Sequence, residues 1–403
     1  MSLFFGKSTT NYAENLKRFN DPVDMIYVST YIPRKCGIAT FTKDLTNAIN
    51  MINPLRLSKI AAMDNKMTES VVYPHEVEFR IREDNYEDYK DLARYINENA
   101  FDLVSIQHEF GIFGGTNGEL VLPFLDEIKK PVVVTLHTVL EFPTSNQRGI
   151  IQKICRKARA VVVMLDAASE ILNKVYGVEK DKIVMIRHGV PDFPRLQLYR
   201  CKKKFGLSRR TVMTSVNLIS PSRGFEYAIE AVPKIVKKVP NFLYLVIGET
   251  HPLYLKENNW KDPYRRKLLK LVKKLKVENH VRFVNKYVSL KRLVSYIGAS
   301  DFYVTPYLNP EQIASGSLSY AIGAGTACIS TPYRYAKEML CDGRGIVPFQ
   351  NSEAISDVVI RLVENPEERE TIEAKVYETG RTMTWINIAH QYYHVFKFVT
   401  DGH

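Results

Sequence analysis

Residues 302–340, FYVTPYLNPEQIASGSLSYAIGAGTACISTPYRYAKEML, decide the fold of this chain. An apolar strand at its start leads through a polar loop into Ser315-Gly316-Ser317, where a helix of small residues is predicted to begin. That helix ends at Gly323-Ala324-Gly325, and residues 327–331 form a second short strand. The order strand, helix, strand predicts a βαβ unit with parallel strands.

The Gly/Ser turn gives this unit a candidate function. A helix N-terminus presents free backbone N–H groups and the positive end of the helix dipole, so it is suited to binding phosphate. Glu311, in the loop just before the helix, is placed to reach a sugar attached to that phosphate. We therefore interpret the segment as a nucleotide-sugar site. An ordinary βαβ turn without a ligand fits the same residues.

Short apolar or β-branched runs alternate with helical patterns through most of the chain. In the first half we predict strands over residues 24–29, 57–62, 102–107, 132–137, 160–165 and 183–187. After a pause at Pro191-Asp-Phe-Pro194, we predict strands over residues 211–216, 242–248, 281–283, 301–305 and 327–331. Two runs of βαβ units indicate an α/β fold of two doubly wound, Rossmann-like domains that face each other across a cleft.

Length and composition agree with two globular domains. A chain of 403 residues exceeds one typical core, and 45% hydrophobic with 25% charged residues is ordinary for globular proteins. No apolar run reaches the roughly 20 residues that span a bilayer, and residues 1–5 are too short for a signal peptide. The five cysteines are scattered without metal-ligand spacing, so we expect reduced thiols in a cytoplasmic protein.

The formal net charge of +12 favours an anionic partner. Basic residues concentrate between Lys261 and Arg292, where residues 264–276, YRRKLLKLVKKLK, combine an apolar helical face with a cationic one. We favour a solvated surface helix, and the alternative is contact with an anionic membrane surface on the inner face of the membrane. No helix-turn-helix, zinc or RNP-type motif supports nucleic acid as the partner.

Loops that directly follow predicted strands carry the other candidate residues. The first such loop, YIPRKCGIATF (residues 31–41), supplies Arg34 as a cation and Gly37 for close backbone approach, and Thr40 is predicted to cap a helix over residues 42–49. Later strand ends in the first half contribute His108, Glu109, His137 and His188.

In the second half, Arg223 ends one strand loop and begins a helix. The helix dipole disfavours a cation there, and a bound anion would remove that conflict.

These motifs, in this order, resemble the retaining glycosyltransferases of the GT-B fold, in the large family-4 group. The resemblance covers nearly the whole chain. It rests on CGIATF (36–41), TLHT (135–138), IRHGV (186–190), ISPSRGFEYAIEA (219–231), the segment 311–325, and Thr384-Trp385. CGIATF with QHEFGIFGG (107–115) and GETHP (248–252) marks a subgroup that resembles transferases linked to mannose-type donors.

The resemblance implies three parts: an N-terminal domain over residues 1–195 on the acceptor side, a C-terminal domain over residues 196–381 that binds the donor, and a helix over residues 382–403 that crosses back. It implies transfer of a sugar from a GDP, UDP or ADP sugar, with GDP-mannose one candidate. The acceptor is a hydroxyl group on a carbohydrate or lipid-linked molecule. The reaction is expected to retain configuration and to need neither a metal nor another cofactor, and no DxD pattern is present.

The resemblance also implies residue roles. Arg223 corresponds to a positively charged residue that neutralises the donor diphosphate as it departs, while backbone amides near Gly316 and Ser317 hold the same phosphates. Gly37 and its loop would close over the phosphates from the other domain. His137 corresponds to a position that touches the transferred sugar, and His188 lies near the floor of the cleft.

Two departures from the family pattern bear on the donor. Members carry two glutamates eight positions apart, and alignment on Gly325 puts Gln312 and Tyr320 at these positions. We expect Glu311 or Gln312 to meet the sugar and Tyr320 to replace the ribose contact. A second basic residue is usual three positions before Arg223, where this chain has Ser220, so Arg34 or Lys35 is expected to compensate. The alternatives are a nucleotide-sugar epimerase and a non-catalytic sugar-nucleotide binder of the same fold.

Overall fold

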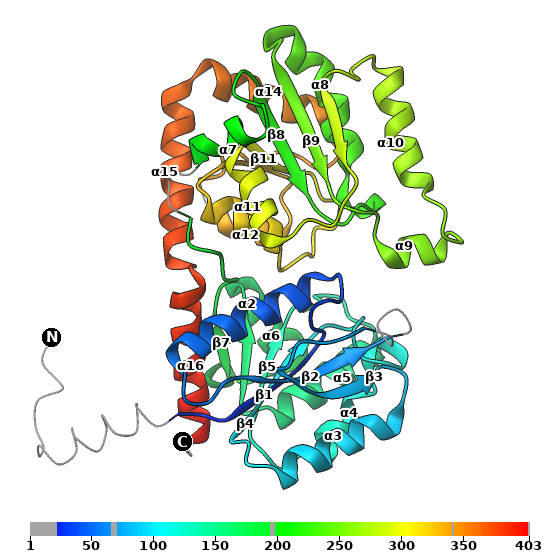
Figure 1. Cartoon of the computed structure of the whole chain (residues 1–403), viewed down its shortest axis with the longest axis vertical. Helices are drawn as coiled ribbons and strands as arrows, with labels where there is room; N and C mark the ends of the chain where they lie inside the picture. Colours follow the sequence, from blue (N-terminus) through cyan, green and yellow to red (C-terminus); the bar gives the residue numbers. More distant parts are fainter. Residues whose placement is uncertain (1–21, 66–70, 194–197, 341, 402–403) are drawn as a thin grey trace, which may run out of the picture. The chain divides into compact units, whose positions relative to one another are not determined.

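The computed structural model describes residues 22–65, 71–193, 198–340 and 342–401. The contacts divide these residues into two compact units (Figure 1). Unit 1 holds the described residues up to Val163, Ser169–Ile186 and those from Ile388 onward, and unit 2 holds Met164–Ala168 and Arg187–Asn387. The predicted absence of a signal peptide in residues 1–5 concerns a segment outside the described residues.

Unit 1 is built on a seven-stranded sheet in the order β3-β2-β1-β4-β5-β6-β7. Every neighbouring pair is parallel. The strands are β1 (Met25–Ser29), β2 (Lys59–Asp64), β3 (Val77–Arg82), β4 (Leu103–His108), β5 (Val132–Leu136), β6 (Ala160–Val163) and β7 (Ile183–Met185). The order reverses between β1 and β4, and ligands of such sheets bind beyond the carboxyl ends of the strands at this switch point.

Helices connect most of these strands, and a further one follows unit 2 in the chain. They are α2 (Gly37–Ile52), α3 (Tyr86–Glu98), η1 (Thr116–Gly118), α4 (Val121–Glu127), α5 (Ser145–Lys157), α6 (Asp166–Tyr176), η2 (Lys180–Lys182) and α16 (Trp385–Thr400). Helix α3 packs on α4, and α4 packs on α5 (Figure 1). The C-terminal part of α16 packs in unit 1, where the Tyr392 hydroxyl lies 3.1 Å from Thr135 Oγ1 and the Phe396 ring lies edge-on to Tyr27.

Two local predictions for unit 1 were wrong. The first helix begins at Gly37, not at residue 42, and the cap is Cys36, whose thiol accepts the Ala39 N–H at 3.3 Å. Thr40 lies inside the first turn and donates its hydroxyl hydrogen to the Cys36 carbonyl. Strand β3 was missed because it lies at the edge of the sheet and its charged residues are mostly exposed.

Unit 2 is built on a five-stranded parallel sheet in the order β10-β9-β8-β11-β12. The strands are β8 (Thr211–Val216), β9 (Phe242–Ile247), β10 (Val281–Val284), β11 (Phe302–Thr305) and β12 (Ala327–Ser330). The helices are α7 (Leu198–Lys204), η4 (Pro221–Arg223), α8 (Phe225–Lys238), α9 (Pro252–Glu257), α10 (Pro263–Lys274), α11 (Leu290–Gly298), α12 (Gly316–Gly323), α13 (Arg334–Met339), α14 (Ser352–Glu364) and α15 (Pro366–Thr382). The two parallel-sheet units confirm the predicted α/β class.

The small residues of α12 allow it to pack against α15. A Cβ placed on Gly380 of α15 would lie 2.7 Å from the Cα of Gly323 and 2.7 Å from the carbonyl oxygen of Ile322. The two backbones therefore cross without an intervening side chain. Gly325, just after α12, has a φ of +69° and faces the Tyr377 ring, so glycine is required there too. The run Gly323-Ala324-Gly325 thus fixes α12 in the core.

The four described cysteines, Cys36, Cys155, Cys201 and Cys328, are free thiols, and Cys341 lies outside the described residues. Within the described ranges, no helix combines the length and apolar character needed to cross a membrane.

Gly380→Ala is expected to destabilise unit 2. The added methyl group would meet backbone atoms, which cannot rotate away, so the cost of overpacking, about 1–3 kcal/mol, outweighs the better helix propensity of alanine. Both tryptophans of the chain, Trp260 and Trp385, belong to unit 2, so urea unfolding followed by tryptophan fluorescence reports on this unit. The matched control is Glu378→Ala at an exposed position of the same helix. Equal midpoints for both variants would contradict the close crossing.

Candidate active site

Two loops meet at the carboxyl edge of the unit 2 sheet, around the switch point between β8 and β11. Arg223 ends η4, after β8, while Tyr307 and Gln312 lie in the loop after β11. Arg223 Nη1 donates a hydrogen bond to Gln312 Oε1 at 3.0 Å. The guanidinium carbon lies 4.6 Å from the centroid of the Tyr307 ring. The structure thus joins two residues that the sequence assigned to the donor site, Arg223 and Gln312.

Tyr307 is a residue of this site that the sequence reasoning missed. Its hydroxyl accepts a hydrogen bond from Asn217 Nδ2 at 2.5 Å and lies 2.9 Å from Ser317 Oγ. Its ring stacks on Tyr333 at a centroid distance of 5.0 Å. Tyr307 therefore connects Arg223 to the N-terminus of α12. Its position two residues after the end of β11 was the signal that could have identified it.

The loop that contains Arg223 is held in one conformation by backbone contacts. Gly224 has a φ of +63°, and a Cβ there would lie 2.1 Å from the Pro306 carbonyl oxygen, so only glycine fits. The Leu308 N–H donates to the Ser222 carbonyl at 3.0 Å, which ties the loops after β8 and β11 together. The hydroxyl oxygens of Ser220 and Ser222 lie 3.0 Å apart beside Arg223.

The Arg223 guanidinium retains an unused donor. Among the residues that the structure describes, its buried Nε has no hydrogen-bond acceptor. A buried N–H without an acceptor costs free energy, and such groups in native structures call for an explanation. An anion bound at this edge of the sheet would supply the acceptor.

The N-terminus of α12 adds a second source of positive potential. Ser315 caps the helix, its Oγ accepting the Leu318 N–H at 3.3 Å, and Gly316 and Ser317 form the first turn. His188 lies against this turn: a Cβ on Gly316 would be 3.1 Å from His188 Nε2. His188 Nδ1 lies 2.7 Å from the Gly189 carbonyl oxygen, so Nδ1 carries the proton and Nε2 is an acceptor. Burial lowers the pKa of His188 to about 4, which keeps it neutral near pH 7.

Tyr320 lies behind His188, with the two rings edge-on at a centroid distance of 5.9 Å. Only 5% of Tyr320 is exposed. The structure therefore groups the predicted residues His188, Gly316 and Tyr320 at the start of α12.

Glu311 is held apart from this group by an ion pair. Arg334 Nη2 lies 3.2 Å from Glu311 Oε1, and Arg334 Nε donates to Oε2 at 3.3 Å, which makes a two-pronged contact. The Glu311 N–H donates to the Asn309 side chain. Of the two predicted sugar contacts, Gln312 is therefore bonded to Arg223, and Glu311 is bonded to Arg334.

In unit 1, His137 lies at the carboxyl end of β5. Its Nε2 is 3.0 Å from Gln107 Oε1, and the Phe41 ring meets it edge-on at 4.9 Å. Arg34 Nη1 contacts Glu83 Oε2 at 3.2 Å, so this cation is already paired within unit 1. A Cβ on Gly37 would meet no atom within 4 Å, so crowding inside the unit does not require glycine there.

His108 and Glu109 differ although they are neighbours. Glu109 accepts the Thr138 hydroxyl at 2.5 Å and the Phe110 N–H at 3.0 Å, and burial raises the pKa of its carboxyl group despite these bonds. His108 is fully buried and lies parallel to the Phe113 ring, and burial lowers its pKa to about 3. His108 is therefore a neutral core residue, while Glu109 is half-buried and its carboxyl group is held by the Thr138 hydroxyl and the Phe110 N–H.

No cluster of three or more His, Cys, Asp or Glu side chains suited to a metal ion occurs in the part of the chain that the structure describes.

Two known protein families match parts of this chain. Residues 201–379 match the family "Glycosyl transferases group 1", and residues 60–192 match "Glycosyltransferase Family 4". One curated relative is the phosphatidyl-myo-inositol mannosyltransferase of Mycolicibacterium smegmatis, which is 22% identical over 323 residues covering 78% of this chain and 75% of the relative.

Solved structures share the fold at low sequence identity. They include a glycosyltransferase from Rickettsia africae, with a TM-score of 0.73 and 15% identity over 94% of this chain and 100% of the other. Anabaena Alr3699/HepE in complex with UDP and glucose has a TM-score of 0.72 and 14% identity over 92% and 99% of the two chains. Sucrose-phosphate synthase from Thermosynechococcus elongatus has a TM-score of 0.75 and 14% identity over 94% and 100%. The chain therefore has the GT-B fold and belongs to the glycosyltransferases, with a family-4 domain in residues 60–192 and a group-1 domain in residues 201–379.

Proposed function

We propose that this glycosyltransferase moves a sugar from a nucleoside-diphosphate donor to a hydroxyl acceptor, with retention of configuration and without a metal ion. The observation that carries the proposal is the Arg223 guanidinium, fixed by Gln312 and Tyr307 and left with a buried, unused N–H. A fixed cation beside a helix N-terminus stabilises the negative charge that develops on a departing diphosphate.

The donor phosphates are proposed to bind Arg223, the Ser220 hydroxyl and the backbone N–H groups of Gly316 and Ser317. Glu311 or Gln312 then meets the transferred sugar, and Tyr320 takes the ribose contact. The name of the Mycolicibacterium relative favours a mannosyl donor, for which GDP-mannose is one candidate. Structural neighbours in complex with UDP, UDP and glucose, or UDP-glucose favour a UDP sugar. GDP, UDP and ADP sugars are therefore the donors to test.

Retention is proposed to follow from displacement on one face of the sugar. The bond between the anomeric carbon and the phosphate oxygen breaks, the acceptor oxygen bonds to the same face, and the departing phosphate takes the acceptor proton. This route needs no nucleophilic side chain on the opposite face. It needs positive charge at the phosphates, which Arg223 and the α12 dipole would supply in place of a metal ion.

The acceptor is proposed to bind residues of unit 1 at the carboxyl ends of β4 and β5. His137 would touch the transferred sugar, and the Glu109 carboxyl group would hold the acceptor hydroxyl, since burial and the Thr138 bond fix it at this edge. The Gly37 loop follows β1, the strand beside β4, and its backbone would add contacts to the donor phosphates, while Arg34 on this loop is paired with Glu83.

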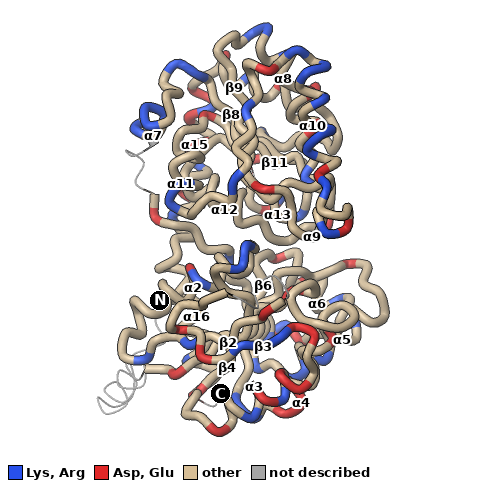
Figure 2. The backbone as a smooth tube through the Cα atoms, turned by 45° about the vertical axis from the view of Figure 1, so that its right-hand side comes forward, with Lys and Arg blue, Asp and Glu red and all other residues tan. Residues whose placement is uncertain are grey.

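We further propose a lipid-linked acceptor and contact with an anionic membrane surface. The relative's name includes a phosphatidyl group, which favours a lipid-linked acceptor. Lysine and arginine follow one another along α10 (Figure 2), where Arg266, Lys270, Lys273 and Lys274 are exposed. Such a cationic helix is attracted to anionic lipid and would not require nucleic acid as a partner.

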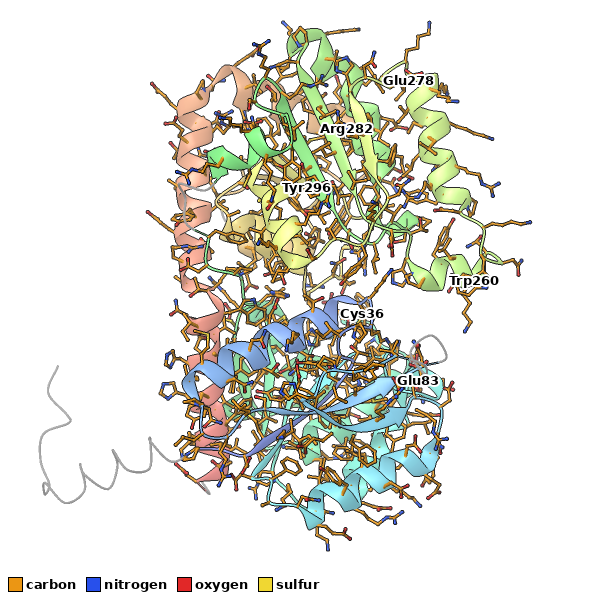
Figure 3. The ribbon with its side chains drawn as sticks, in the orientation of Figure 1. Cys36, Glu83, Trp260, Glu278, Arg282 and Tyr296 are labelled. Atoms are coloured by element: carbon orange, nitrogen blue, oxygen red, sulfur yellow. The ribbon has the colours of Figure 1, made fainter. Side chains whose placement is uncertain are left out.

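Trp260 supports the membrane proposal. It lies at the turn between α9 and α10 (Figure 3) and is 66% exposed. Asn259 and Trp260 both have left-handed backbone angles, φ of 52° and 59°, a conformation that costs about 1–2 kcal/mol for each non-glycine residue. A costly turn that keeps an indole in solvent beside cations fits an interfacial anchor.

The family matches do not favour the two alternatives from the sequence, an epimerase and a non-catalytic sugar-nucleotide binder, and each has a direct test. Incubation with the donor alone would convert it to its epimer only if the protein is an epimerase. Calorimetric binding without turnover over a wide acceptor panel would favour the non-catalytic binder.

Arg223→Ala is expected to lower kcat by about 10²-fold or more, because one fixed cation no longer stabilises the departing diphosphate. A thermal-shift screen with GDP, UDP and ADP sugars first identifies the donor, and turnover is then measured. Arg266→Ala, at an exposed position of α10, is the matched control and is expected to stay near wild type in solution. Turnover of Arg223→Ala within a few-fold of wild type would place the phosphate site elsewhere.

Glu311→Gln is expected to lower turnover while the free nucleoside diphosphate binds normally, because the carboxylate is proposed to meet the sugar and not the phosphates. The control is Arg334→Gln, which breaks the same ion pair but keeps the carboxylate. If turnover falls only in Arg334→Gln, or if Glu311→Gln weakens free-nucleotide binding equally, the assignment of Glu311 is wrong. Calorimetry and initial rates together make the comparison.

Trp260→Ala combined with Lys270→Glu is expected to weaken cosedimentation with phosphatidylglycerol vesicles at least tenfold, since each cation near such a surface contributes about 1 kcal/mol. The wild type should not bind vesicles of phosphatidylcholine, and raised salt should abolish its binding to the phosphatidylglycerol vesicles. Phe142→Ala, which removes another exposed aromatic side chain, is the control. Unchanged vesicle binding in the double variant would remove this surface from the proposal.

A further inference from the structure

The motif Gly248-Glu249-Thr250-His251-Pro252 follows β9 and runs along the loop that leads to Arg223. The Ile219 N–H donates to the Glu249 carbonyl at 2.8 Å, and the His251 N–H donates to the Ile219 carbonyl at 2.9 Å. An isolated parallel bridge joins Ile219 to Thr250. The pairing of β8 with β9 therefore continues past the strand ends and fixes the backbone of His251 beside the donor site.

The fold explains several members of this motif. Gly248 has a φ of +142°, and a Cβ there would lie 1.8 Å from the Asn217 carbonyl oxygen, so glycine is required. The Thr250 hydroxyl donates to the Asp262 carboxylate and accepts from Arg265 Nη2 at 3.0 Å, which locks the loop onto the start of α10. Pro252 is the first residue of α9, a position that favours proline.

The His251 side chain is half-buried and lies close enough to Arg223 to sense its charge. Burial lowers the pKa of His251, and the Arg223 guanidinium lowers it further, while the Glu257 carboxylate on α9 opposes both. A protonated His251 would be repelled by the Arg223 guanidinium, which is always positively charged. The protein without a bound anion therefore favours neutral His251. An anion placed between them would reverse this preference.

The charge of the proposed donor makes a second cation useful. The diphosphate of a nucleotide sugar carries two negative charges at neutral pH, and Arg223 supplies one positive charge. Ser220, on the same loop, is uncharged, and Arg34 in unit 1 is paired with Glu83. Within unit 2, the backbone pairing brings two titratable side chains to the Arg223 loop, Glu249 and His251, and of these two His251 is the one that can become a cation.

We propose that His251 is a second binding residue for the donor diphosphate and acts as an imidazolium that is formed when the diphosphate binds. This inference rests on the proposed function. Binding of the anion cancels the repulsion from Arg223 and adds an attraction, so the protein takes up a proton as the donor binds. The imidazole N–H then donates to a phosphate oxygen beside Arg223.

Titration calorimetry with GDP, UDP and ADP tests this directly, with wild type, His251→Gln and His251→Lys compared from pH 6 to pH 9. Because protonation is lost as pH rises, the affinity advantage of the wild type over His251→Gln should be about tenfold near pH 6 and should vanish by pH 9. His251→Lys should recover the affinity and keep it at high pH. In buffers of different ionisation enthalpy, the wild type should take up more protons than His251→Gln, a difference that excludes protons bound by the nucleotide itself.

His280→Gln is the matched control. His280 directly precedes β10, and its side chain contacts the Phe242 carbonyl group. The variant should bind like the wild type at every pH. A loss in His251→Gln that is equal at all pH values, or that lysine does not restore, would show a structural role and overturn the inference. If Arg223→Ala loses turnover while His251→Gln matches wild type, only the His251 inference fails. If wild type neither binds these nucleotides nor transfers a sugar, both proposals fail.

Discussion

The contact between the Arg223 guanidinium and the Tyr307 ring is the interaction on which the candidate donor site depends. The ring carries the cation on one face, and its hydroxyl reaches Asn217 after β8 and Ser317 on α12. A single side chain thus relates two strand loops and a helix N-terminus. Because Tyr307 is buried and stacked on Tyr333, its side chain is held in one orientation. Arg223 therefore has a defined position before any ligand binds. In many enzymes, charges and dipoles that are held in position before the reaction make the largest single contribution to the rate enhancement.

Close backbone packing provides the rigidity behind that contact. Gly224 and Gly248 each lie within 2.1 Å, measured from an added Cβ, of a carbonyl oxygen in a neighbouring loop, and Gly380 crosses α12 at Gly323. These glycines let loops and helices approach to distances that side chains would prevent. The loops that carry Arg223 and its neighbours are therefore fixed by main-chain contacts. Side-chain salt bridges at an exposed edge would be weaker supports, since they are screened by water and salt.

The sequence was sufficient to predict the fold class and most strands, because alternating apolar runs and helical patterns are local signals. It failed at β3, whose edge position leaves its charges exposed, and at the start of α2, where a cysteine takes the capping position. For the candidate site, strand-end positions singled out Arg223 and the start of α12, the family pattern singled out Gln312, and the structure joins Gln312 to Arg223. The pairing of Glu311 with Arg334 could not be predicted, because it depends on how the chain returns 23 positions later. Tyr307 was missed because its local signal, a position two residues after the end of β11, does not by itself separate a site residue from a core tyrosine.

The placement of the last helix has a consequence for synthesis of the chain. Unit 1 takes residues from both ends of the sequence, since Tyr392 and Phe396 on α16 pack against Thr135 and Tyr27. Most of unit 2, by contrast, is the continuous run Arg187–Asn387. A ribosome that releases the chain from its N-terminus exposes the seven-stranded sheet first, yet the aromatic residues of α16 that cover part of it emerge only after unit 2. Unit 1 must therefore keep an incomplete apolar surface until α16 has emerged.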